Sequence, residues 1–357
     1  MRTLILAVLA LLVSFPATAQ DFKVPIQGFI DGFVRPETVQ FAAVAARLPA
    51  ATRAVCQDTS ETTQTEFRSA FSETVQAYAR VHFLRIGPLI EDDRSSRLSF
   101  LPDPRGIAQR QIRKIYAAVD SAVLSPDSLA GKSVAVQGLS ALELIAFDKT
   151  GAVRLGDMGD NRDFTCSYAL AITENVASIA DRVAADWQIP DGYAGLLLSA
   201  GPDNDTFRAS KEALETVFNT LVTGIIITRD QDVLPVLGSS EAKAKPRRFP
   251  FSRSGNAALY LSGEIGGIRD ALFAMNLKVL TPEEFVWLLD TLDFEFGNSQ
   301  VYVKKLVPPV RQTFKQNNNY GDMKALAIAL DSVRELMAQE LAGALELAGG
   351  FNALDGD

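Results

Sequence analysis

Apolar residues that recur at intervals of three and four are the feature that most limits how this chain can fold. The recurrence is clearest over residues 322–347. On a helix, this recurrence would place the following apolar residues on one face: Met323, Leu326, Leu330, Val333, Met337 and Leu341. This spacing is typical of an amphipathic helix, and the alternating β-branched runs that indicate strands are scarce. The sequence therefore predicts an all-α protein.

Helices are predicted on both sides of a break rich in glycine and aspartate, at about residues 155–163. The predicted segments are residues 35–55, 62–90, 105–124, 132–147, 164–187, 207–234 and 256–275, one that opens at Thr281, and 322–347. Because amphipathic helices bury their apolar faces against one another, we expect two tandem helical bundles, at residues 20–155 and 156–350. Glu73-Thr74-Val75 recurs as Glu215-Thr216-Val217, which raises the hypothesis of a duplication.

Residues 1–19 have the features of a secretory signal peptide. Arg2 precedes an apolar run over residues 4–13, and the small-residue pattern Ala17-Thr18-Ala19 follows. Cleavage is therefore expected just after Ala19. The run is shorter than the roughly 20 apolar residues that a transmembrane helix needs, and no later stretch is long and charge-free enough to anchor the chain. We expect a periplasmic protein with no membrane span.

The formal net charge of -8 bears on the class of partner. An acidic surface disfavours nucleic acid and anionic lipid, so no nucleic-acid partner is expected. The charge is compatible with a cationic ligand, and equally with a role in solubility alone.

Two cysteines, Cys56 and Cys166, are present. In an oxidising compartment we expect them to form one disulfide that closes a long loop. Two buried thiols are the alternative. Their wide spacing does not match a metal-binding pattern.

The chain contains a single histidine, His82, and this limits the catalytic possibilities. A His-Glu-x-x-His zinc site, or any site with several imidazole ligands, is excluded. A Ser-His-Asp triad would have to use His82, which lies on an amphipathic helix. The alternative is a histidine on a helix flank or partly buried beside a carboxylate.

Glu143 is the acid that most needs an explanation, because it lies in the apolar sequence Leu142-Glu143-Leu144-Ile145. A carboxylate in apolar surroundings must be paired, protonated or bound to a cation. Ser140 lies three residues earlier, on the same helix face. The two side chains could form a ligand site. Alternatively, Glu143 has a structural role and is paired with an arginine such as Arg85 or Arg113.

This helix resembles the signature of the imelysin family, Gly-x-His-x-x-Glu followed by an apolar tail. Gly138 and Glu143 match the signature, and Ser140 stands where the family has its histidine. Arg85-Ile86-Gly87-Pro88 is similar to the family's Arg-x-Gly-Pro turn, and the segment 100–106 to its Phe-x-Pro-Asp segment. The stretches 166–187 and 252–272 follow in the family's order.

The resemblance implies two related helical bundles, export to the bacterial envelope, and a site between the bundles near the signature helix. Family members are metallopeptidases or proteins of iron uptake, so a divalent metal such as iron is the implied cofactor, with Glu143 as a ligand. Because a serine hydroxyl is a poor ligand for zinc or iron, Ser140 and Glu143 could instead bind a small polar ligand by hydrogen bonds. His82 and Arg85 complete the candidate ligand-binding set.

Three functions remain open. The first, which we favour, is a periplasmic binding or accessory protein of metal uptake, with iron as the expected metal and an envelope protein as a further partner. The second is a metallopeptidase of the imelysin type, which requires a metal held without the family histidine, or His82 recruited as its substitute. The third is a non-catalytic interaction module with a vestigial site. Close approach of His82 and Glu143 would favour a site, and an arginine on Glu143 would favour the third function.

Overall fold

The computed structural model describes residues 22–157, 159 and 161–348, and within them it contains helices and no strand. A single isolated β-bridge joins Phe147 to Val153. The predicted all-α class is confirmed. None of the helices in these residues is long and apolar enough to cross a membrane. The predicted signal peptide, with its cleavage at Ala19, lies outside the described residues.

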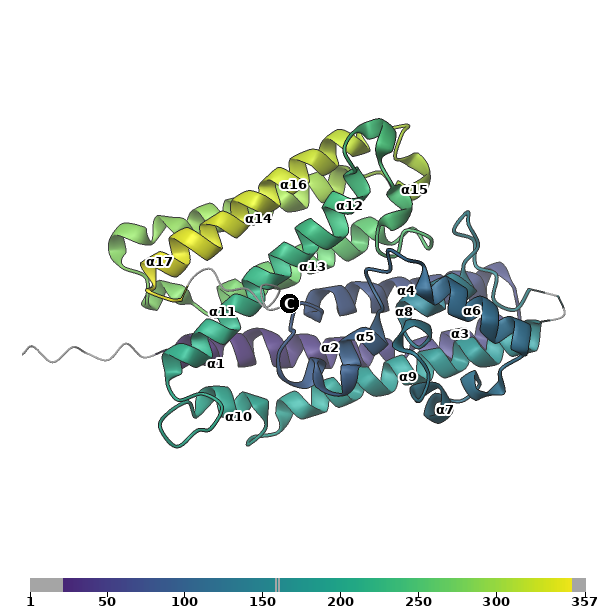
Figure 1. Ribbon diagram of the computed structural model, residues 1–357, viewed down its shortest axis with the longest axis horizontal. Helices are drawn as coiled ribbons and strands as arrows, with labels where there is room; N and C mark the ends of the chain where they lie inside the picture. Colours follow the sequence, from purple (N-terminus) through teal and green to yellow (C-terminus); the bar gives the residue numbers. More distant parts are fainter. Residues whose placement is uncertain (1–21, 158, 160, 349–357) are drawn as a thin grey trace, which may run out of the picture.

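The first bundle is built from long helices that run side by side (Figure 1). Helices α2, α3, α4 and α9 pack on one another, and α8 packs on α9. The π-helical turn Ile30–Val34 joins α1 to α2. The helices of this half are α1 (Lys23–Phe29), α2 (Arg35–Ala45), α3 (Leu48–Gln57), α4 (Glu61–Val81), α5 (Arg94–Leu98), α6 (Ile107–Ala118), α7 (Pro126–Ala130), α8 (Leu139–Ala146) and α9 (Arg162–Gln188).

The second bundle lies above the first in Figure 1 and is formed mainly by α11, α13, α14 and α16. The π-helical segment Ile227–Val233 continues α11 into α12, and another, Leu336–Leu341, follows α16. The helices of this half are α10 (Tyr193–Leu198), α11 (Ser210–Ile226), α12 (Leu234–Leu237), α13 (Ala257–Ala274), α14 (Trp287–Lys305), α15 (Val310–Thr313), α16 (Asn319–Glu335) and α17 (Ala342–Ala344). The six apolar residues used to predict the last helix are all fully buried.

A disulfide joins Cys56 at the end of α3 to Cys166 in α9, as the sequence predicted, across 110 residues. Helix α9 packs on α2 and α3, although it follows the predicted domain limit after residue 155. That limit stays a prediction, and so does the duplication of one bundle from the other.

Several predicted helices differ from the observed ones in their bounds, and two of these differences have clear local reasons. The segment predicted as 62–90 ends as α4 at Val81, and the chain then turns through Gly87, whose φ is +53°. The segment predicted as 132–147 forms a 3₁₀ turn at Val134–Val136 and an α-helix only from Leu139. A Cβ on Gly138 would lie 2.2 Å from the Leu98 carbonyl oxygen, so the chain presses against α5 before α8 begins.

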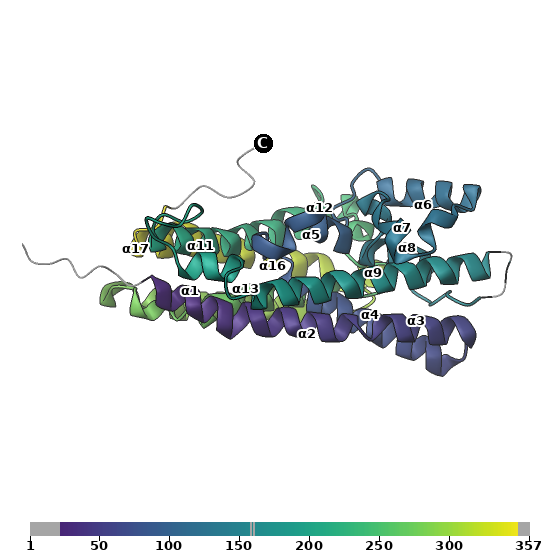
Figure 2. The same cartoon turned by 90° about the horizontal axis from the view of Figure 1, so that it is seen from below.

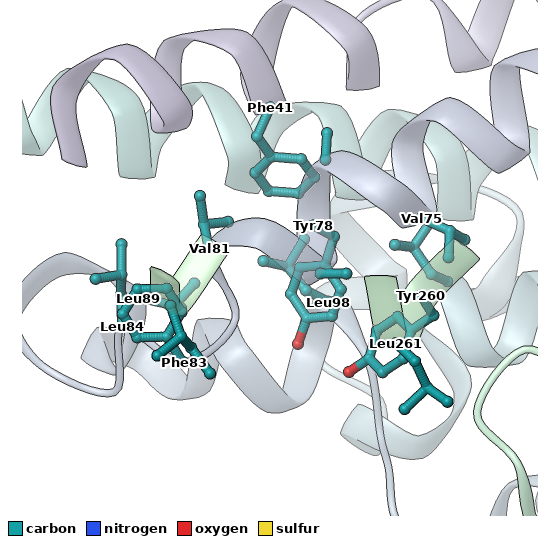
Figure 3. Packing of buried hydrophobic residues seen from close by; sticks show 14 of the residues in the cluster. Phe41, Val75, Tyr78, Val81, Phe83, Leu84, Leu89, Leu98, Tyr260 and Leu261 are labelled. Atoms are coloured by element: carbon teal, nitrogen blue, oxygen red, sulfur yellow. The ribbon is translucent and has the colours of Figure 1, made fainter. Parts of the chain in front are cut away.

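The two bundles meet where α4 packs along α13, and their buried residues form one continuous apolar core. In Figure 3, Tyr260 and Leu261 of α13 lie beside Val75 and Tyr78 of α4. The view in Figure 2 shows the same elongated arrangement from below. Gly267 of α13 faces the backbone of α4, because a Cβ there would lie 2.2 Å from the Arg80 carbonyl oxygen.

We predict that Gly267→Ala destabilises the protein by roughly 1–3 kcal/mol, because the new methyl group would force α4 and α13 apart. The matched control is Gly297→Ala in α14, where an added Cβ meets nothing within 4 Å. That change should raise stability by up to about 1 kcal/mol through helix propensity. Urea denaturation of both variants measures the two effects. Equal stabilities for the two variants would show that α4 and α13 do not pack as described.

Candidate functional site

Helix α8 holds Ser140 and Glu143 at the point where the bundles meet. Both side chains are buried. The Ser140 hydroxyl accepts a hydrogen bond from the backbone N–H of Phe100 at 3.1 Å. Ser140, which stands in the histidine position of the family signature, therefore fastens the segment after α5 to α8.

Glu143 is bound by the loop that precedes α13. Its Oε1 accepts hydrogen bonds from the backbone N–H and the hydroxyl of Ser254, each at 2.8 Å. Burial raises the pKa of the Glu143 carboxyl, while the two Ser254 bonds and the charges of Arg253 and Arg311 oppose this rise. Within the described residues Glu143 has no ion pair, so neither Arg85 nor Arg113 is its partner. The signature carboxyl thus links the first bundle to the second by hydrogen bonds.

His82 lies just after α4 and is also buried, with 3% of its surface exposed. Its Nε2 lies 3.1 Å from Oε1 of Glu264 in α13. Burial, together with the nearby charge of Arg85, lowers the pKa of His82 to about 3. The imidazole is therefore neutral at physiological pH. The rings of Tyr78 and Tyr260 both lie near it, with centroids 6.0 and 5.8 Å from that of the imidazole, and their hydroxyls point to the same side in Figure 3.

Glu264 and Asp232 form a buried acid pair beside His82. Asp232 lies in the π-helical segment Ile227–Val233, and burial raises its pKa to about 7. Burial, together with the negative charge of Asp232, raises the pKa of Glu264 well above its usual value. Two carboxyl groups so close together cannot both ionise without a large penalty, so the pair retains a proton near neutral pH.

The sequence analysis missed both members of this acid pair and also Ser254. Glu264 carried the same signal as Glu143, a lone carboxylate in the apolar stretch Leu261-Ser262-Gly263-Glu264-Ile265. Asp232 follows other charged residues and carried no such signal. Ser254 contacts Glu143 across 111 residues, a pairing that local sequence does not reveal.

The four candidate residues fall into two groups, His82 with Arg85 and Ser140 with Glu143. The segment 99–101 separates the groups: Ser99 and Leu101 line a small cavity with His82 and Arg85, while Phe100 bonds Ser140. No contact joins His82 to Glu143 in the described residues. The cavity at His82 has a volume of about 10 Å³, which is too small for a ligand larger than water.

A bare metal ion does not fit these residues. In the described part of the chain, no three His, Cys, Asp or Glu side chains are placed to hold a metal together. Glu143 is met by hydrogen-bond donors and by two arginine charges, which compete with a cation for its oxygens. We therefore derive no chemical step through a metal, and Glu143 as a metal ligand stays a prediction.

Replacing Asp232 with asparagine tests whether the acid pair holds a proton. The pKa of Asp232 is about 7 in the fold against an ordinary 3.8. The unfolded chain therefore loses this proton first, and the acid pair's contribution to stability falls as pH rises between these values. Asparagine stays neutral in both states. Asp232→Asn should thus gain stability relative to the wild-type chain between pH 4 and pH 8.

Urea denaturation at the two pH values measures this difference. The control is Asp230→Asn, because Asp230 is exposed and pairs with Arg229 on the surface. The control should show no such gain. The same change in stability at both pH values for Asp232→Asn would contradict a shared proton.

Comparisons with known proteins give the fold and the family. The chain resembles the crystal structure of an imelysin-like protein from Psychrobacter arcticum 273-4, with 18% identity, a TM-score of 0.76, and coverage of 92% of this chain and 97% of that one. It also resembles a protein from Parabacteroides distasonis ATCC 8503 named as an iron-regulated protein A precursor, with 12% identity, a TM-score of 0.67, and coverage of 88% and 95%. No curated protein matches the chain. The imelysin family model matches residues 34–339, and the chain therefore belongs to the imelysin family.

Proposed function

We propose that this chain is an exported, periplasmic binding or accessory protein that serves iron uptake and does not hydrolyse peptides. Membership of the imelysin family supports the general class. The likeness to a protein named as an iron-regulated precursor supports both the link to iron and export, and the signal-like residues 1–19 agree with export.

The observation that carries the proposal is that hydrogen bonds from Ser254 occupy the Glu143 carboxylate. Catalytic zinc sites generally use three protein ligands and an open position for water. Here the signature acid accepts two hydrogen bonds from Ser254, and the serine in the histidine position is bonded to Phe100. The signature helix therefore joins the two bundles, a role that supports binding better than hydrolysis.

The metallopeptidase remains the second candidate, because the matching family model is that of a peptidase family. It requires ligands to gather around Glu143 that the described residues do not place there. A non-catalytic interaction module is the third candidate. It keeps the same helix junction but has no link to iron.

Uptake of radioactive iron by cells that lack this gene tests the function. We predict that uptake falls under iron limitation, is unchanged when iron is plentiful, and is restored by the full-length chain. A chain that starts at Gln20 lacks the signal-like segment and is the matched control, because it should stay in the cytoplasm and fail to restore uptake. Unchanged uptake under iron limitation would contradict the proposal and favour the interaction module.

Peptidase activity is tested directly with the purified chain from Gln20 onward. Unfolded casein is incubated with the protein in the presence of zinc or ferrous iron, and products are followed by mass spectrometry. We expect no cleavage above a no-enzyme control. Cleavage that disappears in Glu143→Gln would establish the metallopeptidase instead.

A further inference from the structure

A wide pocket opens beside the C-terminal end of α8, away from the enclosed cavity at His82. Its volume is about 620 Å³, within the roughly 300–1,000 Å³ typical of small-molecule sites. Among the residues that the structure describes, five cationic side chains and one carboxylate, that of Asp157, line it. The cationic residues are Arg113, Lys149, Arg154, Arg162 and Arg253.

Backbone carbonyl groups hold the arginines of this pocket in place. The Nε of Arg154 donates to the Ile145 carbonyl at 2.8 Å, and Nη1 of Arg253 donates to that of Phe147 at 3.4 Å. These carbonyls lie at the C-terminal end of α8, where the helix dipole favours positive charge. A carbonyl orients a guanidinium group but carries no charge to neutralise it.

Carboxylate partners are scarce around these cations. In the part of the chain that the structure describes, no carboxylate oxygen lies within 4.0 Å of the charged nitrogens of Arg113, Lys149, Arg154 or Arg253. Arg162 is the exception and pairs with the exposed Asp163. Burial lowers the pKa of Arg253, the negative charges of Glu143 and Asp148 oppose this, and repulsion from Arg154 adds to it. A chain whose net charge is -8 thus gathers positive charge, with few ion-pair partners, in one pocket.

The wall of the pocket also has an apolar part, formed by Ile112, Tyr116 and Leu144. Guanidinium groups match carboxylate and phosphate oxygens through paired hydrogen bonds. We propose that this pocket binds a small organic polyanion. Its carboxylate or phosphate groups pair with Arg113, Arg154 and Arg253, and its carbon skeleton lies against the apolar wall.

This inference goes beyond the proposed function and does not depend on it. Binding of a polyanion by the purified protein, without any effect on iron uptake in cells, would support the pocket and contradict only the role in iron. Loss of iron uptake in cells, without binding of a polyanion by the purified protein, would support the role in iron and contradict the pocket.

Calorimetric titration of the chain from Gln20 onward tests the pocket. Citrate probes for carboxylate groups, fructose 1,6-bisphosphate probes for phosphate groups, and acetate shows whether one charge suffices. The variant is Arg113→Gln, because Arg113 is exposed on α6 and lines the pocket. The matched control is Lys114→Gln, which removes an exposed charge from the same helix but does not line the pocket.

We expect citrate or the bisphosphate to bind with one-to-one stoichiometry, and acetate to bind at least tenfold more weakly. Affinity should fall at least tenfold in Arg113→Gln and remain unchanged in Lys114→Gln. The better of the two polyanions identifies the anionic group that the pocket prefers. Failure of both to bind at millimolar concentration would overturn the inference. An equal loss in Arg113→Gln and Lys114→Gln would also overturn it, because the attraction would then be diffuse.

Discussion

Burial of carboxyl groups between the two helical bundles is the constraint on which the rest of the structure depends. Glu143 and Glu264 lie in apolar helices on opposite sides of the junction, and neither can remain ionised and unpaired there. Glu143 accepts hydrogen bonds from Ser254, and Glu264 lies against the neutral His82, with its pKa raised by burial and by Asp232. Each of the two glutamates thus meets a residue of the other bundle, so the junction fixes how the bundles meet.

The elements of the fold that depend on local pattern could be predicted from the sequence. The last helix follows from its apolar spacing, and the disulfide follows from two cysteines in a chain that the sequence predicts to be exported. The start of α8 could not be predicted, because it depends on the contact of Gly138 with the Leu98 carbonyl. The site was predicted in part: Glu143 was found as a buried acid, but its partner Ser254 comes from a distant loop that only the folded chain brings near.

Helix α8 has two different roles along its eight residues. Its inner face carries Ser140 and Glu143, which bind backbone groups and tie the bundles together. Its C-terminal carbonyls hold Arg154 and Arg253 at the edge of the cationic pocket. Because Glu143 also lies near the charge of Arg253, a change at the junction would alter the arginines. The family signature thus connects the interior of the protein to this pocket.

The central claim is that Glu143 joins the two bundles through its hydrogen bonds to Ser254, and the competing prediction is that it ligates a metal. Elemental analysis of the purified chain, followed by calorimetric titration with ferrous iron, zinc, calcium and copper, tests it most directly, with Glu143→Gln as the comparison. We expect less than one metal ion per chain, and the same weak titration for both proteins. One tightly bound ion per wild-type chain, lost in Glu143→Gln, would contradict the claim and establish a metal centre at the signature helix.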